Sequence, residues 1–451
     1  MTKETGETTR TAADAGWQVS RYNLISRIQD TDKVVIANLF RGTCAVYSSA
    51  ELFLLNELKT LDEYHPILDR FKKRGLIVNF DELEALKVLG RGVCAGMRTV
   101  SLTICPTMGC NFDCPYCFEN HFPGVMTESV QDDVAGLAGR MLDEVGAEKL
   151  LVIWFGGEPL LAVDVIARLS ERLMALAGEK GAKYEAEIIT NGYLLTQSTA
   201  DLLCRCKVTK AQITLDGLGV VHDKTRHLAG GGSTFARITD NLRHLNLPFE
   251  VKVRHNVHEG NRDEMVPLKS FVENLARESG NRISYYPAPV FSNHTADARS
   301  ENVLLLCGAD SGDVLVSKDA MAFAHGRGHY CTAHLLFSLG IDAQGRLHKC
   351  WEEVDKPEHS FGTAACWDPF DLFATADAPD NLIRYLNTAM PFDDARCLAC
   401  IWLPVCAGGC PKRRLYDGGR CCLPYRDDPG KYVMALYERL QKQVMEKPDE
   451  E

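Results

Sequence analysis

Two hydrophobic periods alternate along the chain from Arg98 onward. Short runs dominated by apolar residues are separated by longer segments in which apolar residues recur every three or four positions. The short runs are typical of buried strands, and the longer segments are typical of amphipathic helices. The predicted strands are 100–104, 150–155, 185–190, 211–215, 250–256 and 282–286, and the predicted helices are 127–144, 163–177, 198–206, 235–245 and 264–278. Six strands in alternation with helices predict an α/β fold built on a parallel sheet.

The N-terminal pattern is of another kind. Residues 1–16 are polar and are expected to form a disordered tail. Residues 17–92 then predict two strands, two helices, a short strand and a third helix, which together suggest a small winged-helix-like module. The expected elements are strands 34–39 and 44–47, a helix at 49–61 capped by Ser49, a helix at 66–74 ended by Gly75, a strand at 76–80 and a helix from Asp81 to Leu89.

Length and charge exclude several classes of protein. The 451 residues exceed what one hydrophobic core usually supports, so two or three domains are expected. The net charge of -11 argues against a general nucleic-acid-binding protein, which would normally have a basic face. No apolar run approaches the ~20 residues needed to cross a bilayer, and the polar N-terminus lacks the apolar core of a signal peptide. We therefore expect a cytoplasmic protein, in which the 18 cysteines are metal ligands or catalytic thiols.

Three cysteines follow the first strand of the α/β region. Cys110, Cys114 and Cys117 have the spacing C-x3-C-x2-C. Thiolates this close in sequence can converge on one soft metal centre, either zinc or an iron–sulfur cluster. Three ligands would leave one iron of a cubane cluster free to bind a small molecule. Cys105 could add a fourth thiolate, although Pro106 makes that geometry awkward. For the triplet alone, a zinc knuckle or a set of buried thiols is the alternative.

A second group of cysteines lies in the C-terminal third. Two of them flank a predicted hairpin of strands 335–341 and 346–350, whose turn contains Gly345. The group comprises Cys331, Cys350, Cys397, Cys400, Cys406, Cys410, Cys421 and Cys422. Packing hardly accounts for eight thiols in this arrangement, and zinc sites seldom show the whole pattern.

Polar residues and glycines follow the predicted strands of the α/β region. In barrels of parallel strands the functional groups lie at the carboxyl ends of the strands. The residues found there are Gly156, Gly157, Glu158, Asn191, Thr214, Asp216, Arg254 and Asn256. Glycines allow close approach of the backbone to a ligand, and Glu158 offers an acceptor for an ammonium group. Each residue taken singly could equally be a cap or a turn residue.

The cysteine loop 104–120 resembles the cluster loop of radical SAM enzymes. In that family three cysteines at this spacing hold a 4Fe–4S cluster, and S-adenosylmethionine (SAM) chelates the fourth iron. The resemblance implies that Cys110, Cys114 and Cys117 are the ligands and that Tyr116 packs beside the adenine. It further implies that the eight strand-end residues given above lie around the SAM methionine and ribose, and that the α/β region is a partial (β/α)6 TIM-like barrel.

The C-terminal pattern C-x13-G-x4-C, a gap, then C-x2-C-x5-C-x3-C resembles the SPASM domain, which binds two auxiliary 4Fe–4S clusters. By family position Cys331, Cys350 and Cys410 would hold the first auxiliary cluster, and the fourth ligand is either Cys307 or a substrate thiolate at an open iron. Cys397, Cys400, Cys406 and one of Cys421 or Cys422, with Cys422 favoured, would hold the second. The expected domains are therefore the tail 1–16, the module 17–92, the barrel 93–287, a linker 288–330, the SPASM domain 331–427 and a C-terminal helix 428–451.

The N-terminal module resembles the precursor-recognition element of radical SAM peptide maturases. The resemblance implies an oxidoreductase with three 4Fe–4S clusters and SAM, supplied with electrons by a flavodoxin or ferredoxin-type donor. It would modify a ribosomally made precursor peptide, whose leader the module binds, by thioether or other cross-link formation. One alternative is an anaerobic sulfatase-maturing enzyme, but that subfamily has an aspartate where this chain has Trp351. Another is a zinc-binding peptide adaptor without chemistry.

Overall fold

The computed structural model describes residues 10–96, 98–289, 331–416, 422 and 426–445. Residues 1–9 of the expected tail, Cys307, Cys421 and most of the expected linker lie outside the described residues. No helix within the described ranges is long and apolar enough to cross a membrane.

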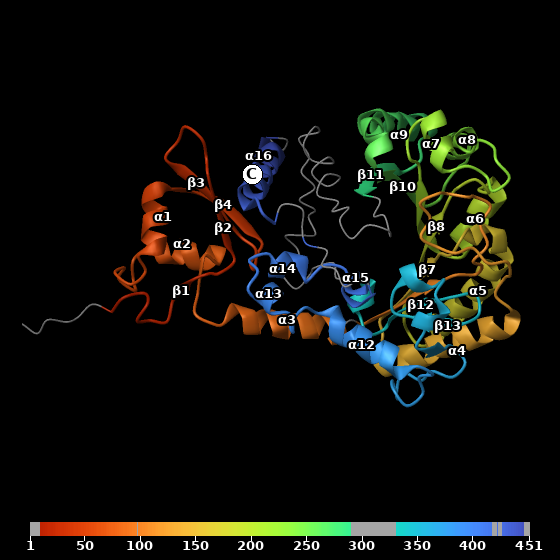
Figure 1. Ribbon diagram of the computed structural model, residues 1–451, viewed down its shortest axis with the longest axis horizontal. Coiled ribbons are helices and arrows are strands. Elements are labelled where there is room, and N and C mark those ends of the chain that lie inside the picture. The colour runs from red at the N-terminus through yellow and green to blue at the C-terminus, as the bar shows by residue number, and fades with distance from the viewer. Residues whose placement is uncertain (1–9, 97, 290–330, 417–421, 423–425, 446–451) are drawn as a thin grey trace, which may run out of the picture.

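Six parallel strands form the centre of the fold (Figure 1). They are β6 (Thr99–Ile104), β7 (Lys149–Trp154), β8 (Lys183–Thr190), β9 (Val208–Thr214), β10 (Glu250–Val257) and β11 (Ile283–Pro289), hydrogen-bonded to one another in chain order. The helices of the connections are α4 (Glu128–Val145), α5 (Val163–Glu179), α6 (Gln197–Arg205), α7 (Val220–Thr225), α8 (Phe235–His244) and α9 (Met265–Ser279), with 3-10 turns η1 (Pro159–Ala162) and η2 (Glu259–Glu264). The predicted α/β partial barrel is confirmed, and all six strands present their carboxyl ends at one edge.

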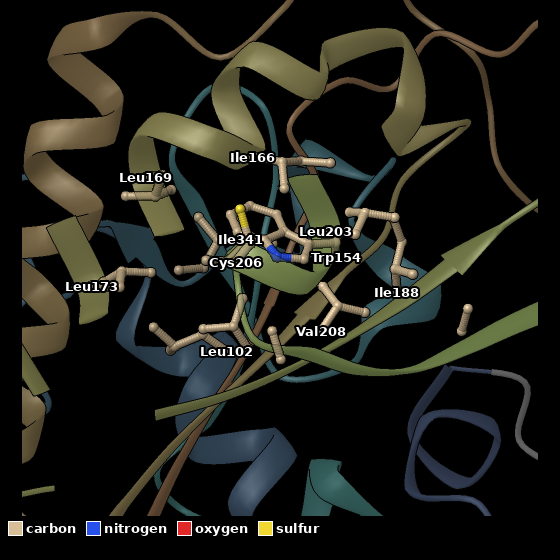
Figure 2. Packing of buried hydrophobic residues seen from close by; sticks show 14 of the residues in the cluster. Leu102, Trp154, Ile166, Leu169, Leu173, Ile188, Leu203, Cys206, Val208 and Ile341 are labelled. Atoms are coloured by element: carbon tan, nitrogen blue, oxygen red, sulfur yellow. The ribbon is translucent and has the colours of Figure 1, made fainter. Parts of the chain in front are cut away.

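The C-terminal hairpin continues this sheet. Strand β12 (Ser338–Ile341) pairs in parallel with β6, and β13 (Arg346–His348) and β14 (Gly362–Thr363) extend the sheet further in antiparallel fashion. The sequence placed this hairpin in a separate domain. The reason for the difference is burial: all four residues of β12 are buried, and Ile341 joins the barrel core beside Trp154 and Leu102 (Figure 2).

The N-terminal module contains a three-stranded antiparallel sheet of β2 (Asn23–Arg27), β3 (Lys33–Asn38) and β4 (Thr43–Ser48). Helices α1 (Ser49–Asn56), α2 (Ile67–Arg74) and α3 (Glu82–Gly96) follow, and β1 (Gln18–Val19) pairs with β5 (Ile77–Val78). The strands β1 and β2 were not predicted. Ser48 rather than Ser49 caps α1, in a capping box with Glu51.

The expected disordered tail is wrong for residues 10–16. Ala12 is fully buried, and its N–H donates to the carbonyl of Leu61 at 2.7 Å. Thr11 forms a bridge with Asp62. The stretch is polar in sequence but folds back on the end of the α1 segment, where one small apolar side chain fills a core position.

Short helices make up the rest of the cysteine-rich region. They are η4 (Thr332–His334), η5 (Trp351–Glu353), η6 (Pro357–His359), α12 (Pro379–Ala389), α13 (Ala395–Leu398), α14 (Leu403–Cys406) and α15 (Pro411–Tyr416), followed by the long helix α16 (Pro429–Met445). One hydrophobic core joins this region to the N-terminal sheet. In it Tyr22 and Leu39 pack in the same cluster as Trp402, Leu403 and Tyr432, and in Figure 1 α16 lies beside β2 and β4.

Candidate radical SAM site

The cysteine loop lies across the carboxyl ends of the barrel strands and is fastened there by several loops. Phe112 forms an antiparallel bridge with Leu228, flanked by hydrogen bonds from Asp113 N to His227 O (3.1 Å) and from Ala229 N to Asn111 O (2.9 Å). The amide of Asn191 donates to Asn111 Oδ1 at 2.7 Å. The loop that carries the cysteines is therefore held by segments that follow β8 and β9.

Gly156 and Gly157 contact the backbone of the cysteine loop. A Cβ on Gly156, which has a φ of +100°, would lie 2.3 Å from Thr107 O, and a Cβ on Gly157 would lie 2.4 Å from Gly109 O. Both approaches are far inside van der Waals contact, so side chains there would displace the loop. The sequence predicted close approach to a ligand, whereas the close approach found is to the loop that carries the cysteines.

Glu158 is completely buried, and its hydrogen bonds connect the segment after β7 to the end of β8. Its Oε1 accepts from Leu160 N (3.0 Å) and Thr190 Oγ1 (2.7 Å), and its Oε2 accepts from Asn191 N (2.7 Å). Burial raises the pKa of this carboxyl, while the three hydrogen bonds lower it. A carboxylate offers about four acceptor positions, so one position remains for a further donor, and the expected contact with an ammonium group stays a prediction.

The hydroxyl of Tyr116 is the centre of a polar network. It donates to Asp216 Oδ2, and it receives hydrogen bonds from Arg226 Nη1 at 3.0 Å and from Asn256 Nδ2 at 3.4 Å. Asn256 is in turn held by Arg254, whose Nε donates to Asn256 Oδ1 at 2.7 Å. The structure thus brings together predicted site residues from three separate segments.

Further contacts position Asp216 and its surroundings. Thr225 Oγ1 donates to Asp216 Oδ2 at 3.0 Å, and the amide of Asn261 donates to the Asp216 carbonyl at 2.8 Å. Thr214, at the end of β9, is buried two residues before Asp216.

Arg226 was not predicted as a site residue. It lies directly after α7, and its guanidinium is 5.7 Å from the centre of the Phe112 ring. Burial lowers the pKa of Arg226, but the negative charges of Tyr116, Cys114 and Asp216 outweigh it and raise the pKa overall. An arginine in a connecting loop fits no spacing rule, so the sequence could not single it out.

Several of the predicted ligand cysteines each accept a local hydrogen bond of the same type. In each case the sulfur accepts the backbone N–H of the residue two positions later. The pairs are Cys110 with Phe112, Cys117 with Glu119, Cys331 with Ala333, Cys350 with Glu352 and Cys406 with Gly408. Such donors stabilise a thiolate, the form that ligates metals. Within the described ranges, the buried thiols of Cys105 and Cys206 receive no such backbone donor.

Burial raises the pKa of the thiols near the barrel edge. Burial raises the pKa of Cys110 to about 12 and that of Cys117 to about 11. Cys117 also lies within 4.8 Å of ligand atoms of Glu119 and His121, a set that could bind a zinc ion instead. Cys105 is fully buried in a separate apolar cluster with Met108 and Phe155, so it packs away from the triplet.

The cysteines of the second group lie in two separate parts of the cysteine-rich region. Cys331, Cys350 and Cys410 each directly precede a helical turn, η4, η5 and α15 respectively. Cys397, Cys400 and Cys406 border the core that is shared with the N-terminal sheet. Cys422 is exposed, and its sulfur lies 3.5 Å from Arg426 Nη1. All cysteines that the structure describes are free thiols.

These residues fit a cluster and a polar ligand. Asp216 Oδ1, Arg226 Nε and Asn111 Nδ2 are buried and have no partner among the described residues. Leaving such atoms unpaired costs about 1–3 kcal/mol each, which a ligand with donor and acceptor groups would recover. The backbone donors to the cysteine sulfurs suit the ligation of iron.

The comparisons agree with this geometry. Residues 104–270 match the model of the Radical SAM superfamily. The chain is 24% identical over 373 residues to the pre-heme d1 synthase of Dinoroseobacter shibae, covering 73% of this chain and 85% of that protein. It is 23% identical to the Fe-coproporphyrin III synthase of Methanosarcina barkeri over 72% of this chain and 86% of that protein.

Solved structures show the same fold. Native anSMEcpe with bound AdoMet and Cp18Cys peptide has a TM-score of 0.55 at 19% identity, covering 77% of this chain and 99% of that one. Streptococcus suis SuiB bound to precursor peptide SuiA has a TM-score of 0.50 at 16% identity, covering 87% of this chain and 95% of that one. The family match, the cysteine loop and the parallel barrel together show that residues 104–270 form a Radical SAM domain, and the C-terminal region is consistent with a SPASM-like domain.

Proposed function

We propose that this protein is a radical SAM peptide maturase that forms a thioether or another cross-link in a ribosomally made precursor peptide. The proposal rests on one observation: the sheet of the N-terminal module shares a hydrophobic core with the cysteine-rich region. Among the described residues, β2 and β4 each pair with β3 alone, which leaves a sheet edge at which an extended peptide can add as a further strand. A leader held there would be anchored to the catalytic part of the chain.

The residues at the barrel edge would then hold the cofactors. Cys110, Cys114 and Cys117 would bind a 4Fe–4S cluster. Tyr116, Asp216, Asn256 and Arg226 would face the SAM nucleoside. Together the cluster and SAM supply the radical that removes a hydrogen atom from a substrate carbon. Gly156, Gly157 and Glu158 would fix the cysteine loop to the strand ends, so that the thiols keep their relative positions.

The two further sets of cysteines would hold auxiliary 4Fe–4S clusters, which makes three in all. Cys331, Cys350 and Cys410 form one set, and Cys397, Cys400, Cys406 and Cys422 form the other. Formation of one thioether transfers a hydrogen atom to the radical and releases the thiol proton, and the remaining electron needs an acceptor. A cysteine-rich domain next to the barrel is a suitable place for that acceptor. A flavodoxin or ferredoxin-type protein would supply the first electron, and we propose that this takes place in the cytoplasm.

Sulfatase maturation is less well supported. The residue after Cys350 is Trp351, whose ring lies 4.9 Å from that of Phe155. An indole in this position cannot take up a proton as a carboxylate does. A second candidate is chemistry on a tetrapyrrole, because two relatives whose length the chain largely covers are named for such products. The N-terminal module favours a peptide over a tetrapyrrole as the substrate.

One experiment separates these functions. Anaerobically reconstituted protein would be incubated with SAM, a reductant and the short peptides encoded beside its gene, and in parallel with an iron porphyrin. If the protein is a peptide maturase, we expect the peptide to lose two hydrogen atoms per cross-link. The linked cysteine should then no longer react with an alkylating reagent. A changed porphyrin with unchanged peptides would support the second candidate. Protein that binds zinc and no iron would be an adaptor without chemistry.

A further inference from the structure

We propose that the hydroxyl of Tyr385 donates a hydrogen bond to a sulfur of the cluster held by Cys331, Cys350 and Cys410, and so raises the reduction potential of that cluster. This inference rests on the proposed auxiliary clusters. It concerns a residue that no cysteine spacing singles out.

Tyr385 belongs to α12, a helix that contains none of the cysteines proposed to hold this cluster. The helix packs against η4 and α15, the elements that Cys331 and Cys410 directly precede. Tyr385 is 2% exposed and forms one buried cluster with Cys350 and Ala333, lined by Trp351 and Leu415. The fold therefore places one phenol at the meeting point of three chain segments that each present a cysteine.

The hydroxyl of Tyr385 has no hydrogen-bond partner among the residues that the structure describes. Its oxygen is buried and makes no hydrogen bond to any described residue. A buried hydroxyl without a partner costs about 1–3 kcal/mol. Glu353 Oε1 lies 3.0 Å from His359 Nδ1, and the hydroxyl of Tyr385 makes no hydrogen bond to this nearby carboxylate. The hydroxyl thus needs an acceptor that the described part of the chain does not provide.

The thiols beside Tyr385 are the acceptors that the fold places nearest: Cys350 shares its buried cluster, and Cys331 and Cys410 precede the two elements that α12 packs against. Burial raises the pKa of the Tyr385 phenol first, and the negative charges of Cys350, Glu353, Cys331 and Cys410 raise it further. A phenol is protonated at neutral pH, so the hydroxyl of Tyr385 can act as a hydrogen-bond donor.

The consequence is a change of potential. Hydrogen bonds to the sulfurs are among the factors that set the potential of an iron–sulfur cluster. A donor stabilises the more negative, reduced state, so it makes the cluster a better electron acceptor. In the proposed reaction, an electron must leave the substrate as the new bond forms, and Tyr385 would favour that transfer.

The test compares Tyr385→Phe with the parent protein in a background of Cys110→Ala, Cys114→Ala and Cys117→Ala. In this background the iron signals come from the auxiliary clusters alone. Phenylalanine keeps the ring in place. We expect about eight irons per chain in both proteins. In a redox titration followed by EPR, one cluster of the variant should shift to a more negative potential and the other should not move.

The matched control is Tyr416→Phe. Tyr416 lies beside the same set of cysteines but stacks on His359 at 3.9 Å and is half-buried, so its hydroxyl is not confined. This variant should leave both potentials unchanged. Electron–nuclear double resonance in D2O should also detect an exchangeable deuteron near the reduced cluster that Tyr385→Phe removes.

Three outcomes would overturn the inference. With clusters present, equal potentials in the parent and in Tyr385→Phe would show that the hydroxyl does not act on them. Loss of about four irons in Tyr385→Phe would make the residue a ligand rather than a donor. Absence of any cluster in the parent background would overturn both this inference and the proposed auxiliary clusters.

Discussion

The hydroxyl of Tyr116 donates a hydrogen bond to the carboxylate of Asp216, although the two residues are a hundred positions apart. Tyr116 stands between two of the predicted cluster ligands, and Asp216 follows β9. The contact joins the cysteine loop to the edge where SAM is expected, and it forms only when β6 and β9 occupy their places in the sheet.

Replacing Tyr116 by phenylalanine tests this link. The variant keeps the ring but removes the bonds to Asp216 and Arg226, which should cost about 1–3 kcal/mol. We expect full iron content and a raised KM for SAM in assays of 5′-deoxyadenosine formation. Tyr64→Phe is the control, because that side chain is 82% exposed. An unchanged KM would show that the network does not serve SAM binding.

Metal content tests the cysteine loop. Wild-type protein should hold about twelve irons per chain. Replacing Cys110, Cys114 and Cys117 by alanine should remove about four of them and abolish SAM cleavage, as measured by iron analysis and chromatography. Cys366→Ala is the control, since this exposed thiol lies outside every predicted set. A triple variant that still makes 5′-deoxyadenosine would refute the assignment.

Gly157→Ala tests the contact between the strand-end glycines and the cysteine loop. The added methyl group would lie 2.4 Å from Gly109 O and 2.7 Å from Met108 O, both backbone atoms. Overpacking of this kind costs about 1–3 kcal/mol, and displacement of the loop should lower the iron content. Both are measurable by denaturant unfolding and iron analysis.

The control for Gly157 is Gly178→Ala in α5. A Cβ at Gly178 meets nothing within 4 Å, so the change should stabilise the helix by up to about 1 kcal/mol. Equal stability of the two variants would contradict a steric requirement at Gly157.

Trp402→Ala tests the core shared by the N-terminal sheet and the cysteine-rich region. The indole is 2% exposed and meets the Tyr432 ring edge-on, with 4.9 Å between ring centres. Its removal should cost about 3–5 kcal/mol. Limited proteolysis should then release the N-terminal module, and peptide modification should fall more than SAM cleavage without peptide.

Phe370→Ala is the matched control for Trp402, since Phe370 is 61% exposed. It should change stability by no more than about 0.5 kcal/mol. If Trp402→Ala leaves the module as resistant to protease as the wild type, the shared core does not hold the two parts together.

The sequence alone determined the elements of the barrel and the chemistry of its edge. Local apolar periods carry the alternation of strands and helices, so the ends of β6 to β11 lie within three residues of their predicted positions. The spacing of Cys110, Cys114 and Cys117 is equally local. The position of Glu158, Asn191 and Asp216 after successive strands indicated one shared edge, because parallel strands all end there.

The tertiary structure alone decided which groups meet across the chain. Several contacts join residues from distant segments. They are the contact of Gly156 with Thr107, the hydrogen bond of Arg226 to Tyr116, the pairing of β12 with β6 and the packing of Tyr385 with Cys350. Local periods carry no information on such contacts, since these depend on sheet order and on where each connection returns. For the same reason Ala12, in a polar stretch, is a core residue: its burial is decided by the surface that the rest of the module offers.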